Sequence, residues 1–309
     1  MLLAKPIFWD LKKPNLISKF LTIFSNITIL INNLRFNKIK IKNIKTICVG
    51  NIYLGGTGKT PTCIYINKIL KNLGKKTTFI KKQYVNQLDE QLLLKKNGNL
   101  ICKPKRIEAI RAAKSKKFKF AICDDGLQDK NIDYDYKIVC FNSEVFVGNG
   151  LVIPAGPLRE KLENLKNYHA VIINGNGDNL KKHKNLLKKF NKNLKIFEGR
   201  YILDNNMKKL RKKKLIAFSG IGNHSTFINT LKKNNIKIFK SLNFPDHYDY
   251  TDQDIIKIKK LAHQNNCGIV TTEKDILRLN NKNKKNIHIF KIKIEIDKKK
   301  EFINCLKKI

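Results

Sequence analysis

The chain has 309 residues, of which 42% are hydrophobic, so it can bury a sizeable core and form one large domain or two smaller ones. It carries 64 Lys and Arg residues against 24 Asp and Glu residues, a net charge of +40, which favours an anionic partner such as nucleic acid, a phospholipid surface or a phosphorylated substrate. The sequence contains no RNP1-like segment, zinc-finger spacing or basic run interleaved with aromatic residues, which argues against nucleic acid.

Composition also limits the other functional classes. Lys- and Asn-rich stretches such as residues 181–195 resemble a coding bias towards A/T-rich codons, so part of the positive charge is expected to carry no specific function. The seven cysteines form no C-x-x-C pair and have mostly apolar neighbours, which indicates reduced core thiols. The six histidines show no H-x-x-x-H spacing, so a structural zinc site is not expected.

Residues 1–35 are predicted to contain an amphipathic helix. Lys19 and several Ser and Asn residues make the stretch too polar to span a bilayer, and no cleavage site follows it as in a signal peptide. The pattern fits a helix lying in the plane of a membrane, with Trp9 and lysines at the interface, and a helix packed on its own domain is the alternative. The apolar residues at helical spacing are Leu16, Ile17, Phe20, Phe24, Ile27, Leu30, Ile31 and Leu34.

The stretch Ile44–Thr60, IKTICVGNIYLGGTGKT, organises the chain. A buried strand runs into a glycine-rich turn, and a helix opens at Lys59 and Thr60. Such glycines let backbone N–H groups converge on a phosphate, Lys59 can reach the β- and γ-phosphates, and the Thr60 hydroxyl can bind Mg²⁺. The strict P-loop pattern has glycine where this chain has Tyr53, and an ordinary glycine-rich turn is the alternative. The predicted nucleotide-binding residues are Tyr53, Leu54, Gly55, Gly56, Thr57, Gly58, Lys59 and Thr60.

Strands and helices alternate after this loop. The order predicts an α/β fold, with a P-loop NTPase-type parallel sheet and helices on both faces, within residues 36–195. A boundary is expected near residues 195–214, followed by linker strands and a smaller C-terminal α/β domain within residues 196–309. The segments behind this prediction are helices at 62–73 and 103–114, a helical run from Asp89, and strands at 76–80, 136–142 and 168–174.

Two aspartates follow a predicted strand in FKFAICDDGLQ, residues 118–128. Asp124 and Asp125 then lie at the carboxyl edge of the sheet, where ligands bind in open α/β folds. One carboxylate can hold Mg²⁺ opposite Thr60, which is a Walker-B-like arrangement, and a turn-forming Asp-Asp-Gly is the alternative. Arg159 ends a loop rich in glycine and proline and is a candidate contact for an anion.

Further polar residues stand at predicted sheet edges. Asp89 and Glu90 open a helix, where acidic residues are usually caps. Asp246 and His247 lie in a loop that precedes Thr251, a predicted N-cap. A histidine beside an aspartate in such a loop is either catalytic or merely exposed.

The motifs form an ordered set that covers nearly the whole chain. They are GNIYLGGTGKTP, DDGLQ, GLVIPAGPLRE, FSGIGN, FPDHY and VTTEKD, and in this order they resemble the tetraacyldisaccharide 4'-kinase family of lipid A biosynthesis. The family's loop has a non-glycine residue where Tyr53 stands. The resemblance implies a kinase that uses ATP and Mg²⁺ to phosphorylate the 4'-hydroxyl of tetraacyldisaccharide 1-phosphate, giving lipid IV-A.

The resemblance also implies roles for single residues. Lys59 and Thr60 match the P-loop residues, Asp124 and Asp125 the metal-binding pair, and His247 the histidine of a catalytic dyad. Asp89 is the nearest match for the aspartate of that dyad, which takes the proton of the acceptor hydroxyl. The expected contacts of the lipid substrate are Tyr84, Gln128, Arg159 and Glu160.

The resemblance implies that the N-terminal helix lies in the cytoplasmic face of a bacterial inner membrane. The protein is expected to be a monomer, and no nucleic-acid partner is expected. This chain departs from the family at Lys82–Val85, at Asp129 and at His224, mostly on the disaccharide side of the site. Two other interpretations remain open. One is a P-loop NTPase that acts as a switch or metallochaperone on a protein partner, and the other is a non-catalytic nucleotide-binding relative.

Overall fold

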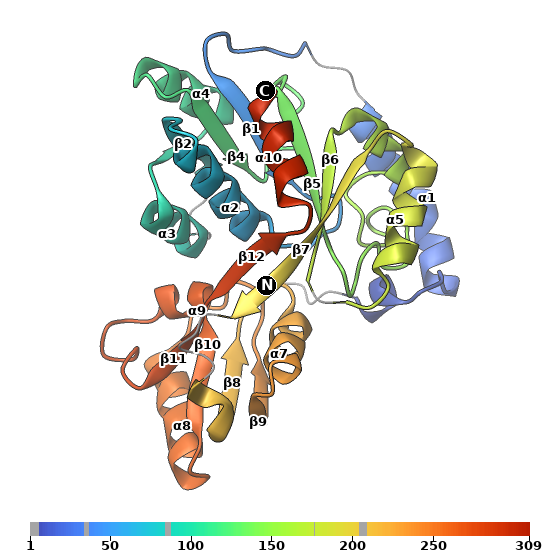
Figure 1. The fold of residues 1–309 in the computed structure, drawn as a ribbon. Coiled ribbons are helices and arrows are strands. Elements are labelled where there is room, and N and C mark those ends of the chain that lie inside the picture. The colour runs from blue at the N-terminus through green and yellow to red at the C-terminus, as the bar shows by residue number, and fades with distance from the viewer. Residues whose placement is uncertain (1–5, 34–36, 84–87, 176, 204–208) are drawn as a thin grey trace.

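Two sheets organise the computed structural model, which describes residues 6–33, 37–83, 88–175, 177–203 and 209–309 (Figure 1). The larger sheet has the strand order β12-β7-β6-β5-β1-β4-β2-β3. Neighbouring strands run parallel except at β7 and β12, which pair antiparallel. The bounds are β1 (Lys45–Gly50), β2 (Thr77–Lys82), β3 (Leu100–Lys103), β4 (Phe120–Asp124), β5 (Tyr136–Asn142), β6 (Ala170–Asn174), β7 (Lys195–Leu203) and β12 (Ile292–Ile296).

Helices cover both faces of the larger sheet. On one face α2 and α10 pack through residues such as Ile66 and Phe302, and on the other α4 packs through Ile110 and α5 through Leu187. The central strand β1 is buried after its first residue, as expected for an apolar strand covered on both sides. The helices are α2 (Lys59–Asn72), α3 (Leu88–Asn97), α4 (Arg106–Ser115), η3 (Leu162–Asn167), α5 (Leu180–Phe190) and α10 (Lys299–Lys307).

A smaller parallel sheet, with the order β11-β10-β8-β9, forms the C-terminal domain. Helix α7 packs on one face through Phe227, and α8 packs on the other through Ile255. The predicted cap at Thr251 is confirmed as a complete capping box with Asp254. The elements are η4 (Lys209–Lys212), β8 (Lys214–Ser219), α7 (His224–Lys233), β9 (Lys237–Asn243), α8 (Asp252–Gln264), β10 (Gly268–Thr272), α9 (Glu273–Arg278) and β11 (Ile287–Phe290).

The structure confirms the predicted fold class and differs in detail from the predicted boundaries. Helix α2 starts at Lys59, where the sequence predicts that a helix opens, and Pro61 fits in its first turn because the missing N–H breaks no helical hydrogen bond there. The short strand β3 was not predicted. Helix α10 returns from the C-terminal domain and joins the core of the larger sheet through Phe302 and Leu306.

The N-terminal segment, η1 (Ile7–Asp10) and α1 (Leu16–Asn33), lies against the larger sheet's side of the molecule (Figure 1). Two serines of α1 face inward: Ser18 is fully buried, and Ser25 donates to the Val152 carbonyl at 2.7 Å. Ile29 packs against the core cluster that contains Val152, and eight other apolar residues of the helix are exposed: Leu16, Ile17, Phe20, Ile23, Phe24, Ile27, Leu30 and Ile31. None of the helices in the described part of the chain has the length and apolarity needed to cross a bilayer.

Candidate functional site

The loop between β1 and α2 forms a backbone cradle at the carboxyl end of β1. Gly55 and Gly58 have φ values of 140° and 80°, which residues with a side chain rarely adopt. A Cβ atom on Gly58 would lie 2.7 Å from both the Asn174 amide nitrogen and the Tyr201 hydroxyl. Asn174 Nδ2 also donates to the Thr57 carbonyl at 2.9 Å. The sheet therefore supports the cradle from behind and requires glycine at its turn.

Tyr53 explains how this loop functions without the first glycine of the strict pattern. Its side chain is 2% exposed and belongs to the apolar cluster that contains Phe141 and Leu158. Its hydroxyl donates to Asp10 Oδ1 in η1 at 2.6 Å. The tyrosine thus anchors the loop to the core and to the N-terminal segment, and Tyr53, predicted to bind the nucleotide, is not among the residues that line the cavity beside this loop, whereas Leu54 to Thr60 are.

Thr60 and Asp124 meet as predicted. They lie at the start of α2 and the end of β4, and Thr60 Oγ1 donates to Asp124 Oδ2 at 3.1 Å. The same carboxylate oxygen accepts from Lys81 Nζ on β2, also at 3.1 Å. Hydroxyl and carboxylate oxygens are the donors that Mg²⁺ prefers, so this pair fits a magnesium site next to the phosphate cradle.

Asp125 faces the predicted cations. Lys59 Nζ lies 3.8 Å and Arg159 Nη1 lies 3.1 Å from Asp125 Oδ1. Burial raises the pKa of this carboxyl, but the charges of Lys59 and Arg159 outweigh that effect and hold the pKa below its ordinary value. Gln128 Oε1 accepts from Arg159 at 3.1 Å, which fixes the guanidinium.

Asp129 stands where the resembling family has a histidine, and the structure gives it a partner. It pairs with Arg106 at 3.0 Å, and Arg106 Nη2 donates to the Asp125 carbonyl at 2.9 Å. Asp125 has a φ of 58°, a conformation that a non-glycine residue keeps only when it is held. Asp129 therefore acts through Arg106 on the turn that presents Asp125.

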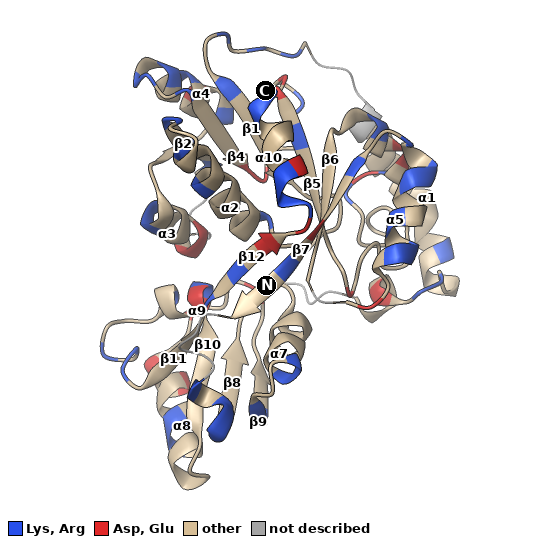
Figure 2. Cartoon of the chain, viewed as in Figure 1, with Lys and Arg blue, Asp and Glu red and all other residues tan. Residues whose placement is uncertain are grey.

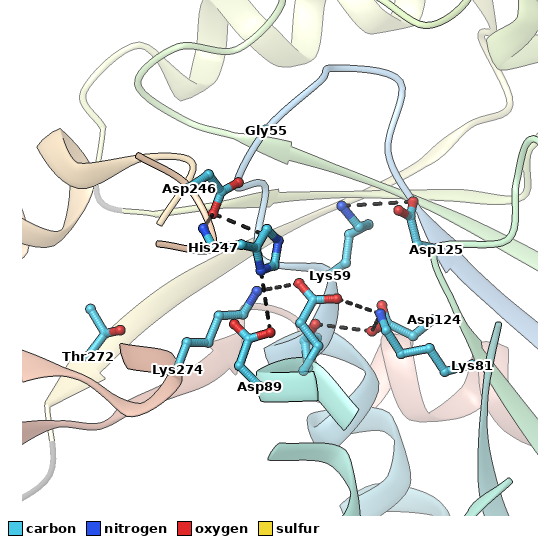
Figure 3. A network of polar contacts seen from close by, with 12 residues as sticks. Gly55, Lys59, Lys81, Asp89, Asp124, Asp125, Asp246, His247, Thr272 and Lys274 are labelled. Carbon is cyan, nitrogen blue, oxygen red and sulfur yellow. Dashed lines mark hydrogen bonds and ion pairs between the residues drawn. The ribbon is translucent and has the colours of Figure 1, made fainter. Parts of the chain in front are cut away.

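Asp89 and His247 also come together, from α3 and from the loop after β9 (Figure 3). His247 Nδ1 lies 3.4 Å from Asp89 Oδ1, and this contact raises the pKa of His247 above its ordinary value. Burial raises the pKa of Asp89, but His247 and the positive charges of Lys274 and Arg278 outweigh burial and hold that pKa far below its usual range. Asp89 is therefore ionised at neutral pH, although its side chain is only 2% exposed.

Glu90 links this pair to the metal side of the site. Its two carboxylate oxygens accept from Lys81 Nζ and from Lys274 Nζ. Lys81 in turn donates to Asp124, so charges of alternating sign run from β4 through α3 to α9. The network joins the larger sheet to the C-terminal domain.

A cavity of about 1030 Å³ lies between the two parts of the protein. Its walls include the P-loop, Asp125 and Arg159 on one side and Asp246, His247 and Lys274 on the other. The two sides approach closely, because a Cβ atom on Gly222 would lie 3.1 Å from the Gly56 nitrogen. The arrangement can hold a phosphate chain and a second reactant in one space.

Glu160 and Gln128, two of the residues predicted to contact the substrate, hydrogen-bond to other residues of the chain and are not among those that line the cavity. Glu160 accepts from the Tyr168 hydroxyl at 2.6 Å and from Asn164 at 2.8 Å, and Gln128 donates to the Asn51 carbonyl at 3.0 Å. Tyr84 lies outside the residues that the structure describes.

Sequence reasoning gave no role to three cations of the site. Lys81 ends a strand in a Lys-Lys pair and therefore looks like a solvent-exposed strand end, yet its side chain is 2% exposed. Lys274 and Arg278 are four residues apart on α9, a spacing that places both on one helical face. This spacing, directly after a strand that ends in two threonines, is the sequence signal that could have identified Lys274 and Arg278 as residues of the site.

The chain is similar in sequence to known proteins. A family model described as Tetraacyldisaccharide-1-P 4'-kinase matches residues 17–88 and 82–309. A tetraacyldisaccharide 4'-kinase from Pelagibacter ubique (strain HTCC1062) is 48% identical over 311 residues, covering 100% of this chain and 99% of that protein. The chain belongs to the tetraacyldisaccharide 4'-kinase family. A tetraacyldisaccharide 4'-kinase from Rickettsia conorii is 32% identical to this kinase over 301 residues, which cover 91% of each chain.

A solved structure has the same fold as this kinase. It is the LpxK protein from Aquifex aeolicus in complex with ATP, with a TM-score of 0.73 over 95% of this chain and 99% of that one. The two sequences are 20% identical, so the likeness supports the fold and leaves the roles of single residues to the geometry described above.

Proposed function

We propose that the protein transfers the γ-phosphoryl group of ATP to the 4'-hydroxyl of tetraacyldisaccharide 1-phosphate, giving lipid IV-A. The observation that carries this proposal is the single cavity that joins the P-loop to His247. A phosphate donor and a hydroxyl acceptor can meet there, as phosphoryl transfer requires. Family membership agrees with it and does not favour the alternative of a P-loop switch or metallochaperone acting on a protein partner.

On the donor side, the chain's own residues bind and neutralise phosphate. Backbone N–H groups of Gly55–Thr60 and the start of α2 cradle the phosphates, and Lys59 supplies a charge to the β- and γ-phosphates. Arg159, held by Asp125 and Gln128, lies on the same wall and adds a second cation. These groups stabilise the charge that develops during transfer.

Thr60 and Asp124 are the residues that would hold Mg²⁺, with Asp125 beside them. The fit rests on their oxygen donors and on the Thr60–Asp124 contact of 3.1 Å. A bound Mg²⁺ supplies neutralisation of the phosphate oxygens. Lys81 and Thr60 fix the Asp124 carboxylate so that its oxygens stay in place.

On the acceptor side, Asp89 and His247 act as a pair. His247 lines the cavity, and Asp89 contacts the ring nitrogen on the other side. The pair takes the proton of the acceptor hydroxyl, because the Asp89 carboxylate favours the charged imidazole that results. Asp246, 3.9 Å from His247 Nε2, adds a second negative charge near the ring.

The lipid side of the proposal rests on α1. The helix packs on its domain through buried serines, and most of its apolar side chains point away from the domain: Phe20 is 65% and Leu30 68% exposed. Lys and Arg lie on helices of both parts of the chain (Figure 2), so an anionic bilayer attracts the whole molecule. The protein then acts, as a monomer, at the cytoplasmic face of a bacterial inner membrane, where its lipid substrate lies.

The proposal is tested by transfer of label from [γ-³²P]ATP to tetraacyldisaccharide 1-phosphate in detergent micelles with Mg²⁺. The wild type is expected to label the lipid and Lys59→Ala to lose activity by at least about a hundredfold, the scale of one transition-state contact. Lys71→Ala, an exposed position on the same helix, is the matched control. ATP hydrolysis without labelled lipid would refute the kinase assignment.

A further inference from the structure

Helices α3 and α9 bring the two parts of the protein together beside the cavity. Helix α3 carries Asp89 and Glu90, and α9 carries Lys274 and Arg278. Three ion pairs cross this interface: Arg278–Asp89, Lys274–Glu90 and the outer Lys96–Glu273 pair. In the described part of the chain, Arg278 is the residue of α9 whose side chain donates hydrogen bonds to Asp89.

Arg278 binds three groups at once. Its Nη2 lies 2.6 Å and its Nε 3.2 Å from Asp89 Oδ2, so two donors share one carboxylate oxygen. Its Nη1 donates to the Gly220 carbonyl at 2.7 Å and to Asp275 Oδ1 at 3.1 Å. The guanidinium side chain is 7% exposed, so the contacts are made away from water.

The Gly220 carbonyl connects Arg278 to His247. It accepts from the His247 backbone N–H at 3.1 Å, and the Gly220 N–H itself donates to Asp275 Oδ1 at 2.9 Å. His247 has a φ of 58°, so its position depends on such contacts. One side chain therefore fixes the Asp89 carboxylate and the backbone that presents the histidine ring.

We propose that Arg278 is a positioning residue for phosphoryl transfer, which holds Asp89 Oδ1 towards His247 by occupying Oδ2 and bracing Gly220. This inference rests on the proposed role of the Asp89–His247 pair. A planar fork with several donors is needed for three simultaneous contacts, whereas a lysine offers one point charge. Arg278 is not among the described residues that line the cavity, so its loss is expected to lower turnover and to leave ATP binding in place.

The test compares Arg278→Ala, Arg278→Gln and Arg278→Lys with the matched control Lys96→Ala. The control breaks the outer ion pair between the same two helices, whose atoms lie 3.8 Å apart. We measure kcat and the KM for ATP with the lipid acceptor, and the thermal unfolding temperature of each protein. The three Arg278 variants are expected to lose at least tenfold in kcat with KM within about twofold of the wild type, and Lys96→Ala to keep its kcat.

A double mutant completes the test. If Arg278 acts through Asp89, then Asp89→Asn with Arg278→Ala has the same kcat as Asp89→Asn alone. The inference is overturned if the two losses multiply, if Arg278→Lys restores the wild-type kcat, or if Arg278→Ala and Lys96→Ala behave alike. Should Arg278→Ala fail to fold, the same comparisons are made with Arg278→Gln, which keeps a donor for Gly220.

The same experiment separates this inference from the proposed function. Wild-type turnover in Asp89→Asn would refute the role of the Asp89–His247 pair. An inactive Asp89→Asn together with a fully active Arg278→Ala would refute only the role of Arg278.

Discussion

Lys81 gives the sharpest prediction about the charge network. Its Nζ lies 3.1 Å from Asp124 and also binds Glu90, and the side chains of Lys81 and Asp124 are at most 2% exposed. Lys81→Met keeps the aliphatic stem but leaves two carboxylates without their shared cation. Removing one partner of a buried ion pair costs about 3–5 kcal/mol, a large part of the stability of a typical domain.

The pH dependence of this cost follows from Glu90. Burial raises the pKa of Glu90, but the charges of Lys274 and Lys81 hold it well below the ordinary value of 4.5. In the wild type, the stabilisation is therefore present above that value and is lost as the pH falls through the lower folded-state pKa. Without Lys81, Glu90 gains a proton at higher pH than in the wild type, so the difference between the two proteins shrinks as the pH falls through the Glu90 pKa of the variant.

Urea unfolding followed by far-ultraviolet circular dichroism measures the effect. Lys81→Met is expected to unfold about 1 M earlier than the wild type at pH 7, since 3 kcal/mol divided by a slope of about 3 kcal/mol/M gives that shift. Lys103→Met, an exposed position on the neighbouring strand β3, is the control. If the midpoints of the two variants coincide at pH 7, the account of the buried network is wrong.

In the P-loop, Gly58→Ala is expected to weaken ATP binding at least tenfold by calorimetry, because alanine at a φ of 80° costs about 1–2 kcal/mol and its Cβ displaces two supporting side chains. Unchanged affinity would contradict the cradle. The pKa of His247 in an NMR titration is expected above 6.5 and to fall in Asp89→Asn. The contribution of the His247–Asp89 contact to stability is complete below pH 6.5 and is lost as the pH rises through the raised pKa of His247. Equal His247 pKa values in the wild type and in Asp89→Asn would exclude the contact. Phe20→Glu with Ile23→Glu is expected to lower co-sedimentation with anionic vesicles severalfold, and an unchanged bound fraction would exclude α1 as the membrane contact.

Much of the fold could be predicted because local sequence determines it. The apolar run of β1 with a glycine turn, the strand before Asp124 and the cap at Thr251 all depend on neighbours in the chain. Parallel pairing then places the ends of β1 and β4 side by side, with Val49 opposite Asp124. The meeting of Thr60 with Asp124 followed from that geometry.

The rest of the site depends on contacts between segments far apart in the chain. Lys81 looks like a surface residue until α3 covers it, and Arg278 acquires its role only when α9 meets Asp89, 189 residues away in sequence. His224 is similar: its ring bridges Ser219 and Ser241 at 2.6 Å each, which no local pattern indicates. The family resemblance suggested Asp89, and the packing of α3 on α9 explains its environment.

The most direct test of the central claim is single-turnover transfer from ATP to the lipid acceptor in Asp89→Asn, with the ATP dissociation constant measured on the same protein. The dissociation constant is expected to stay within about twofold of the wild-type value and the transfer rate to fall at least a hundredfold, because the P-loop is intact and the pair at His247 is not. A wild-type rate, or a loss of ATP binding that accounts for the slower transfer, would contradict that claim.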